Sequence, residues 1–255
     1  MDFKGKVAIV TGSGSPRGIG REIIRAFAEK GCAVVAADMD FDGARQNAVD
    51  IEKNYGVDTM AVPVNVTEEA SVKAMLEAVF KRFGRIDIMC NNAGITQPVT
   101  IENMGYNDFM RIVNVNLVGT FLCSKHVVPY MVKGGYGRIV NTSSVSAKCG
   151  GGVYGGAHYC AAKAGIIGFT RAQAFELCKQ YKDMITVNCV CPGLIATDIR
   201  TALSDEKEKE ARDKQAMGRA GTAREVADTI VWLASDEASY ISGEDVNING
   251  ASYFG

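Results

Sequence analysis

Short apolar runs alternate along the chain with segments that have the hydrophobic spacing of helices. Each run is rich in valine, isoleucine and alanine and ends in small or polar residues, which predicts a strand. These strands are expected at residues 6–12, 32–38, 85–94, 137–144 and 185–193. A helix over residues 18–31 would place Ile19, Ile23 and Phe27 on one face. Residues 68–84 repeat apolar side chains at i, i+3, i+4 and i+7 and predict another helix.

Strands that are apolar nearly throughout are typical of a parallel sheet covered on both faces. Their alternation with helices therefore predicts an α/β fold, a Rossmann-like doubly wound domain with helices on both faces of the sheet. The second half continues the pattern and contains no linker, repeat or low-complexity tract, so we predict one domain over residues 1–255. The charge run at residues 204–214 is interpreted as a solvated helix face or part of a lid, because it follows a Pro-Gly turn.

Composition narrows the possible partners and the compartment. The 255 residues are 47% hydrophobic and carry a net charge of −1, which favours neither nucleic acid nor an anionic membrane as partner. No apolar run is long enough to span a membrane, and nothing resembles a signal peptide. The eight cysteines are scattered, several within apolar runs, which predicts buried free thiols in a reducing, cytoplasmic protein.

Cys189 and Cys191 stand two residues apart, a spacing that could serve a metal or redox site. Alternate residues of a strand share one face, so a buried structural pair is the favoured interpretation. We therefore predict no metal site.

A glycine-rich loop follows the first predicted strand and leads directly into a helix. Gly12 and Gly18 would allow a tight turn and close backbone approach, and Gly20 would let the helix pack near the strand. The helix N-terminus then faces a phosphate or pyrophosphate. A lone glycine pattern is weak evidence, but here the strand and the helix that it requires are both predicted.

Asp38, at the end of the second predicted strand, bears on the choice of cofactor. A carboxylate there would accept hydrogen bonds from a ribose 2′-hydroxyl and would repel a 2′-phosphate. Arg17 favours the opposite choice, because its guanidinium could bind that phosphate. Asp38 carries more weight because it stands where the acidic residue of the motif is expected. We predict NAD, with NADP possible; the alternative interpretation of Asp38 is a strand-end cap.

Tyr159 and Lys163 stand four residues apart in a run of alanine and glycine, so a helix would place both on one face. A phenol titrates near pKa ~10, and a nearby cation favours its ionised form, so Lys163 is expected to lower the pKa of Tyr159. The pair would then act as an acid–base unit. Tyr154 is a competitor, but four residues after it stands His158 and no fixed cation.

Together these segments resemble the classical short-chain dehydrogenase/reductase family over nearly the whole chain. The resemblance rests on "TGSGSPRGIG" (11–20), "NNAG" (91–94), "NVNLVG" (114–119), "IVNTSS" (139–144), "YCAAK" (159–163), "PGLIATD" (192–198), the stretch from Arg219 and "SGEDVNINGA" (242–251). It implies a seven-stranded parallel sheet, NAD(P)-dependent interconversion of an alcohol and a carbonyl, and a homotetramer or homodimer.

The resemblance also implies roles for individual residues. Tyr159 would be the general acid/base, Lys163 would hold the nicotinamide ribose, Ser144 would bind the substrate oxygen, and Asn116 would relay protons to the lysine. Ser143 is the fallback for Ser144, and Asn116 could instead be a helix-interior amide bonded to backbone. The implied cofactor-binding residues are Gly12, Arg17, Gly18, Ile19, Gly20, Asp38, Asn65, Val66, Asn92, Ala93, Gly94, Tyr159, Lys163, Pro192, Gly193, Ile195 and Thr197.

Three departures from the family pattern are visible. The glycine loop is longer than its commonest form, Asn65 stands where the family usually has aspartate, and the interval from Ser144 to Tyr159 is extended and glycine-rich. Asn91 is expected beside Ala93 and Gly94 on the adenosine side. His126 is expected to be structural, and His158 to touch substrate or a neighbouring helix. Residues 94–100, 148–158 and 194–218 should form the substrate pocket, the last as a lid.

The leading functional hypothesis is an oxidoreductase for the secondary alcohol of a polyol, sugar or hydroxysteroid. One alternative is an NADPH-dependent 3-oxoacyl thioester reductase. A non-catalytic NAD-binding protein is disfavoured because Asn116, Ser144, Tyr159 and Lys163 are all present. A sugar-nucleotide epimerase or dehydratase of the extended family is disfavoured because the chain looks too short for a second domain.

Overall fold

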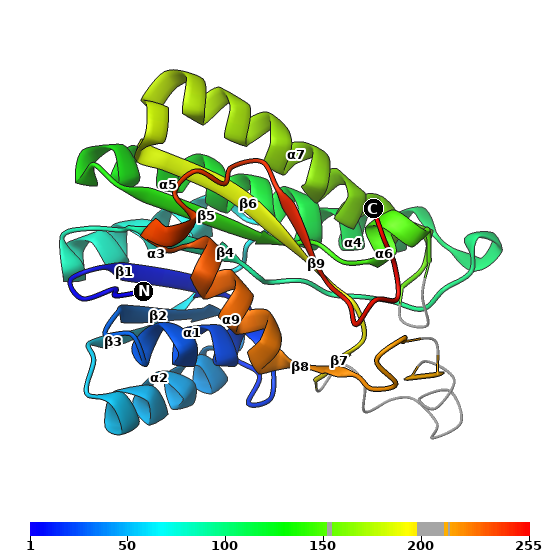
Figure 1. Cartoon of the computed structure of the whole chain (residues 1–255), viewed down its shortest axis with the longest axis horizontal. Helices are drawn as coiled ribbons and strands as arrows, with labels where there is room; N and C mark the ends of the chain where they lie inside the picture. Colours follow the sequence, from blue (N-terminus) through cyan, green and yellow to red (C-terminus); the bar gives the residue numbers. More distant parts are fainter. Residues whose placement is uncertain (152–154, 198–211, 214) are drawn as a thin grey trace.

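Seven parallel strands form one sheet in the computed structural model, which describes residues 1–151, 155–197, 212–213 and 215–255 (Figure 1). In spatial order they are β3 (Thr59–Pro63), β2 (Ala33–Asp38), β1 (Val7–Thr11), β4 (Ile88–Asn91), β5 (Gly137–Thr142), β6 (Ile185–Pro192) and β9 (Asp245–Ile248). Every neighbouring pair is parallel. The predicted doubly wound α/β fold is confirmed. The strand order reverses between β1 and β4, where such sheets bind ligands.

Helices connect the strands and cover both faces of the sheet. They are α1 (Ile19–Ala28), α2 (Phe41–Tyr55), α3 (Glu69–Phe83), α4 (Tyr106–Val113), α5 (Gly119–Gly134), α6 (Ser146–Cys149), α7 (Ala157–Tyr181) and α9 (Ala223–Leu233). Two short strands, β7 (Ile195–Ala196) and β8 (Gly221–Thr222), pair apart from the main sheet. Short 3₁₀ turns occupy Ile101–Asn103, Lys182–Met184 and Asp236–Ala238, and a π-helical segment covers Asn114–Val118.

The core forms two layers, one on each face of the sheet. Alternate residues of β1 enter opposite layers, as the twofold period of a strand requires: Ala8 and Val10 pack with α1, α2 and α9, and Val7 and Ile9 with α3, α5 and α7. The predicted face of α1 is confirmed, since Ile23 and Phe27 are fully buried and Ile19 packs against their cluster.

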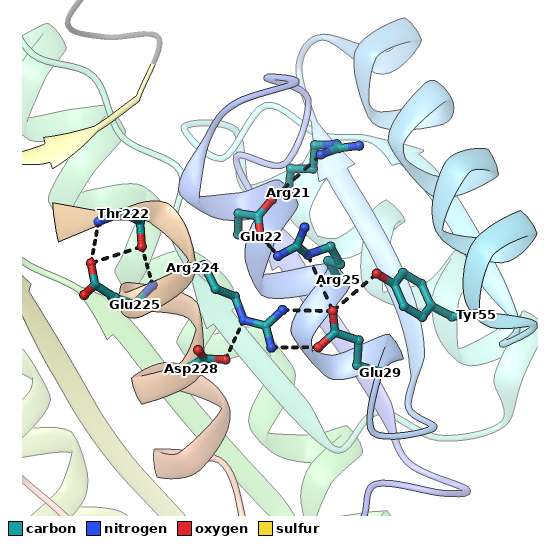
Figure 2. Close-up of polar contacts among 9 residues, drawn as sticks. All are labelled: Arg21, Glu22, Arg25, Glu29, Tyr55, Thr222, Arg224, Glu225 and Asp228. Carbon is teal, nitrogen blue, oxygen red and sulfur yellow. Dashed lines mark hydrogen bonds and ion pairs between the residues drawn. The ribbon is translucent and has the colours of Figure 1, made fainter.

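An ion-pair network fastens α9 to α1 at the surface of one layer (Figure 2). Arg224 of α9 donates from Nη1 and Nη2 to the two carboxylate oxygens of Glu29, at 2.8 and 2.7 Å, and from Nε to Asp228 at 2.7 Å. Tyr55 of α2 donates to the same Glu29 at 3.3 Å. These bonds lower the pKa of Glu29, the hydrogen bond from Arg224 being the main cause. α9 is thereby joined to α1 and α2, from which it is distant in sequence.

In the described part of the chain, no helix combines the length and the apolarity needed to cross a membrane.

Candidate active site

A cavity of about 1170 Å³ runs along the carboxyl ends of six neighbouring strands, from β3 to β6 in spatial order. It brings together almost all the residues expected to bind cofactor or substrate. The expected residues that line it are Gly12, Gly18, Ile19, Asp38, Asn65, Val66, Asn92, Ala93, Gly94, Asn116, Ser144, Tyr159, Lys163, Pro192, Gly193, Ile195 and Thr197. Arg17 and Gly20 are the two that do not. Arg17 is exposed, and Gly20 is buried behind the glycine loop.

The glycine loop lies against the start of α1, as the sequence predicts. A side chain at Gly20 would collide with the carbonyl oxygen of Gly12, so the helix can approach the strand only because this residue is glycine. Gly12 itself has φ +70°. Asn92 holds the turn by donating from Nδ2 to the carbonyl oxygens of Thr11 and Gly12, at 3.0 and 3.1 Å. The loop is therefore fixed by backbone and amide contacts.

Asp38 ends β2 beside this loop. Its carboxylate accepts the backbone N–H of Gly14 at 2.7 Å and that of Asp40 at 3.0 Å. Asp38 and Asp40 both line the cavity at its β2 end, and the Asp40 carboxylate also caps α2 by accepting the N–H of Gly43 at 3.1 Å. The strand-end cap considered from the sequence is thus present, in a residue that also lines the cavity.

Two asparagines expected on the adenosine side form hydrogen bonds within the protein itself. Asn65 lines the cavity, but its Oδ1 accepts from the amide and hydroxyl of Thr67, and its Nδ2 donates to Glu68. Asn91 was expected beside the cofactor, and this is wrong: it is buried, and its Nδ2 donates to Ser124 and Asn141 at 2.8 Å. The strand alternation turns Asn91 into the core and leaves Asn92 facing the cavity.

Tyr159 and Lys163 lie one turn apart near the start of α7. The ammonium of Lys163 is 5.6 Å from the centre of the Tyr159 ring and donates to the carbonyl oxygen of Thr142 at 2.7 Å. Burial lowers the pKa of Lys163 to about 8. The predicted placement of Tyr159 and Lys163 on one face of a helix is confirmed.

The expected lowering of the Tyr159 pKa is wrong for this structure. Burial raises the pKa of Tyr159 above its ordinary value, and only a hydrogen bond from Ser144 acts in the opposite direction. The physical reason is that Lys163 is turned to Thr142, while desolvation disfavours the phenolate. Tyr159 therefore keeps its proton at neutral pH.

Ser143 and Ser144 both line the cavity, but their hydroxyl groups have different partners. Ser143 donates its hydroxyl to the carbonyl oxygen of Lys163 at 2.8 Å, which ties the end of β5 to α7. Ser144 accepts the backbone N–H of Ser146 at 3.1 Å and bonds with Tyr159. The geometry supports Ser144 over the fallback, because Ser143 is occupied by the backbone.

Asn116 lies in the π-helical segment between α4 and α5. Its Nδ2 donates to the carbonyl oxygens of Ile112 and Ile95, both at 2.9 Å, so the backbone-bonding interpretation is correct for the nitrogen. Its Oδ1 is buried without a hydrogen-bond partner. A Cβ at Gly94 would lie 2.6 Å from this oxygen and 3.3 Å from the Lys163 nitrogen. The free acceptor therefore opens toward Lys163, as a water relay would require.

The two histidines lie outside the cavity lining. His126 of α5 bonds Glu69 of α3 across 2.6 Å and is structural, as predicted. His158 is fully buried, and its Nδ1 accepts the backbone N–H of Tyr159 at 2.8 Å. His158 therefore packs at the start of α7 rather than against substrate.

All eight cysteines are free thiols, and Cys189 and Cys191 are buried in a small apolar cluster with α7. No group of three or more metal-ligating side chains occurs within the described residues.

Some expectations fall outside the described residues. Tyr154 and most of the charge run and of the lid, residues 198–211 and 214, are among them. Conversely, the cavity has lining residues outside every segment that was expected to form it, among them Ser146 and Ser252. No local sequence pattern marks either residue, because the path of the chain around it is what places it in the cavity.

Comparisons of the sequence with known proteins identify the family to which the chain belongs. The model of a family described as enoyl-(acyl carrier protein) reductase matches residues 12–251. The 3-oxoacyl-[acyl-carrier-protein] reductase FabG of Escherichia coli (strain K12) is 40% identical over 253 residues, 99% of each chain. FabG of Aquifex aeolicus is 38% identical over the same share. An uncharacterised short-chain type dehydrogenase/reductase of Sinorhizobium fredii is 40% identical over 98% of each chain. The chain therefore belongs to the short-chain dehydrogenase/reductase family and is a nicotinamide-dependent oxidoreductase that interconverts an alcohol and a ketone.

Proposed function

We propose that this enzyme reduces 3-oxoacyl thioesters to 3-hydroxyacyl thioesters with NADH, and that Tyr159 is the general acid. The observation that carries the proposal is the placement of Tyr159 beside Ser144 in the cavity, where burial raises the pKa of Tyr159. The names of the relatives favour this alternative over the polyol, sugar or hydroxysteroid hypothesis. Reduction needs a proton donor at the ketone, and burial keeps Tyr159 in that form.

The residues present fit a nicotinamide dinucleotide. The glycine loop, Asp38 and the narrow gap beside Gly94 would cradle it along the strand ends, and it would supply the hydride when bound. Tyr159 would donate its hydroxyl proton to the substrate oxygen, which Ser144 would also hydrogen-bond. Lys163 would return a proton to Tyr159 through a water, which the free Oδ1 of Asn116 would hold by accepting a hydrogen bond.

The choice of NADH over NADPH rests on the β2 end of the cavity. A 2′-phosphate about 4 Å from one carboxylate would be disfavoured by about 4 kcal/mol at an effective dielectric constant near 20. Asp38 and Asp40 supply two carboxylates there, whereas Arg17 does not line the cavity. The acyl part would occupy the other end, where the described lining is uncharged. Over the whole described lining of the cavity, the charged side chains are Asp38, Asp40 and Lys163.

We further propose that the chain assembles into homodimers or homotetramers. Large aromatic side chains on the outer faces of the helices support this, among them Phe109 of α4, Phe121 of α5 and Phe175 of α7, which are exposed. Light scattering after size-exclusion chromatography would give the mass. A monomer at micromolar concentration would contradict it.

The test measures absorbance of NADH and NADPH with acetoacetyl-coenzyme A, a 3-oxoacyl-carrier protein, polyols and hydroxysteroids. We expect thioester turnover with NADH that is lost in Tyr159→Phe. Asp38→Ser should raise kcat/KM for NADPH at least about tenfold relative to NADH, because a repulsive charge is removed. Turnover of polyols alone would refute the substrate class, and equal activity of Tyr159→Phe would refute the role of Tyr159. Preference for NADPH in the unaltered enzyme would refute the role of Asp38.

A further inference from the structure

The helix α6 stands directly after Ser144 and contributes Ser146 and Cys149 to the cavity. Between these two residues lies Lys148, whose side chain is only 10% exposed. Its ammonium donates to Asp245 Oδ2 at 2.5 Å, to Asn247 Oδ1 at 2.9 Å and to the carbonyl oxygen of Gly255 at 2.8 Å. An ammonium has three N–H donors, and all three are used. Lys148 thus ties α6 to β9 and to residue 255, beside which α6 lies in Figure 1.

Asp245 carries the other half of this connection. It is 9% exposed and also accepts from Arg171 of α7 at 2.6 Å. Burial acts to raise the pKa of Asp245, but the bonds from Lys148 and Arg171 outweigh it and hold that pKa below its ordinary value. A buried ion pair is weak evidence for stability, because apolar residues of the same size often serve as well. The Lys148–Asp245 ion pair lies beside the cavity, so we consider whether it holds the cavity wall in place.

The segment after β9, residues 249–255 (the tail), is folded back tightly onto that position. Asn249 donates from Nδ2 to the carbonyl oxygen of Tyr253 at 2.9 Å and accepts the N–H of Ala251 at 3.1 Å. Ala251 has φ +60°, a conformation that costs a non-glycine residue free energy. Asn247 donates to Gly255 at 3.0 Å. This turn leaves Ser252 lining the same cavity as Ser146 and Cys149.

We propose that the tail is a wall of the substrate pocket, with Ser252 in contact with the acyl chain, and that Lys148 is the positioning residue that holds this wall and α6 together. None of these groups lies at the β2 end of the cavity, where the adenosine of the cofactor would bind. The acyl class of the ligand rests on the proposed function, whereas the connection between α6 and the tail does not. Lys148 therefore controls affinity for substrate and leaves affinity for the dinucleotide unchanged.

The experiment compares Lys148→Met, Lys148→Arg and a chain lacking residues 253–255 with the unaltered enzyme. Lys73→Met, which removes an exposed lysine paired with Glu69 on α3, is the matched control. Steady-state kinetics would use acetoacetyl-coenzyme A and a longer 3-oxoacyl thioester. We expect the KM of both thioesters to rise about tenfold in Lys148→Met and in the shortened chain, since bonds to a charged group are lost. The KM for NADH should stay constant, and Lys148→Arg should recover most of the loss.

A second measurement does not depend on turnover. The rate at which iodoacetamide alkylates Cys149, an exposed thiol next to Lys148, would be followed by mass spectrometry. It should rise several-fold in Lys148→Met and in the shortened chain and not in Lys73→Met. If no thioester is reduced by the unaltered enzyme, the proposed function fails, and the alkylation rates still decide whether α6 is held by the tail. Unchanged alkylation in both variants, or equal rises in KM for NADH and thioester, would overturn the inference.

Discussion

Lys163→Met should make the folded protein more stable at neutral pH while it abolishes activity. Lys163 is 4% exposed, and burial lowers its pKa from the ordinary 10.5 to about 8. This difference corresponds to roughly 3 kcal/mol by which the folded state disfavours the charged lysine. Methionine fills a similar volume without charge but leaves the carbonyl oxygen of Thr142 unpaired, which costs about 1–3 kcal/mol. At pH 7 the variant should therefore be more stable by about 1 kcal/mol.

The sign of this difference depends on pH. Between pH 8 and 10.5 the unfolded chain still binds a proton at Lys163 and the folded chain does not, so the stability of the unaltered protein rises with pH through this window. Below pH 8 the cost of the buried charge is fully present. Of the roughly 3 kcal/mol, about 2 kcal/mol is relieved between pH 7 and 9.5. The advantage of the variant should therefore vanish or reverse at pH 9.5.

Urea denaturation at pH 7, 8.5 and 9.5 would measure these free energies, with Lys73→Met reporting effects common to the loss of any lysine. Other titrating groups cancel when the variant and the unaltered protein are compared at one pH. A stability difference that stays within about 0.5 kcal/mol between pH 7 and 9.5 would refute the reasoning, because it would mean that Lys163 is not desolvated. A variant that is less stable at pH 7 would show that the bond to Thr142 outweighs the buried charge.

Three further predictions concern other parts of the molecule. Gly94→Ala places a methyl group 2.6 Å from Asn116 Oδ1, so kcat should fall at least about tenfold, with near-normal circular dichroism; full activity would contradict the proposed relay. Because burial raises the pKa of Tyr159, the rate of ketone reduction should stay constant through neutral pH and fall only in the alkaline range, whereas the rate of alcohol oxidation should rise with pH. Initial rates would be measured in both directions, and a reduction rate that already falls near neutral pH would mean that the phenolate is the resting form. Arg224→Met should lower the free energy of unfolding by about 1 kcal/mol, seen in thermal scans as a Tm decrease of about 2–4 °C that becomes smaller at high salt. The control Arg82→Met, which removes the single bond to Asp58, should leave the Tm nearly unchanged.

The apolar runs predict the fold well because the central strands are buried on both faces. Every residue of β1, β5 and β6 is buried, so continuous hydrophobicity is a reliable signal for them. The outer strands β3 and β9 were not singled out from the sequence. β3 ends in a proline and is mostly half-buried, and β9 reads "DVNI", so neither repeats the pattern of the centre. Their place is determined by tertiary pairing with β2 and β6.

The candidate site was predictable in its residues and less so in its electrostatics. Spacing alone places Tyr159 and Lys163 on one face, but the direction in which Lys163 points depends on where β5 ends, at Thr142. The choice between Ser143 and Ser144 likewise depends on which hydroxyl meets the backbone of α7. Ser146 and Ser252 line the cavity only because of the path of the chain around them, which no local pattern records.

Burial favours the uncharged form of both members of the proposed acid–base pair, Tyr159 and Lys163. It raises the pKa of Tyr159 and lowers that of Lys163, because a desolvated site disfavours either charge. Neither group is then stabilised as an ion by the resting protein. In the proposed mechanism, a negative charge that develops on a substrate oxygen beside Tyr159 and Ser144 would accept the phenol proton and would attract the Lys163 ammonium, whose resting partner is the neutral carbonyl of Thr142. In that mechanism the site would therefore interact more strongly with the transition state than with the ketone, and this difference, rather than a preformed phenolate, would accelerate the reaction.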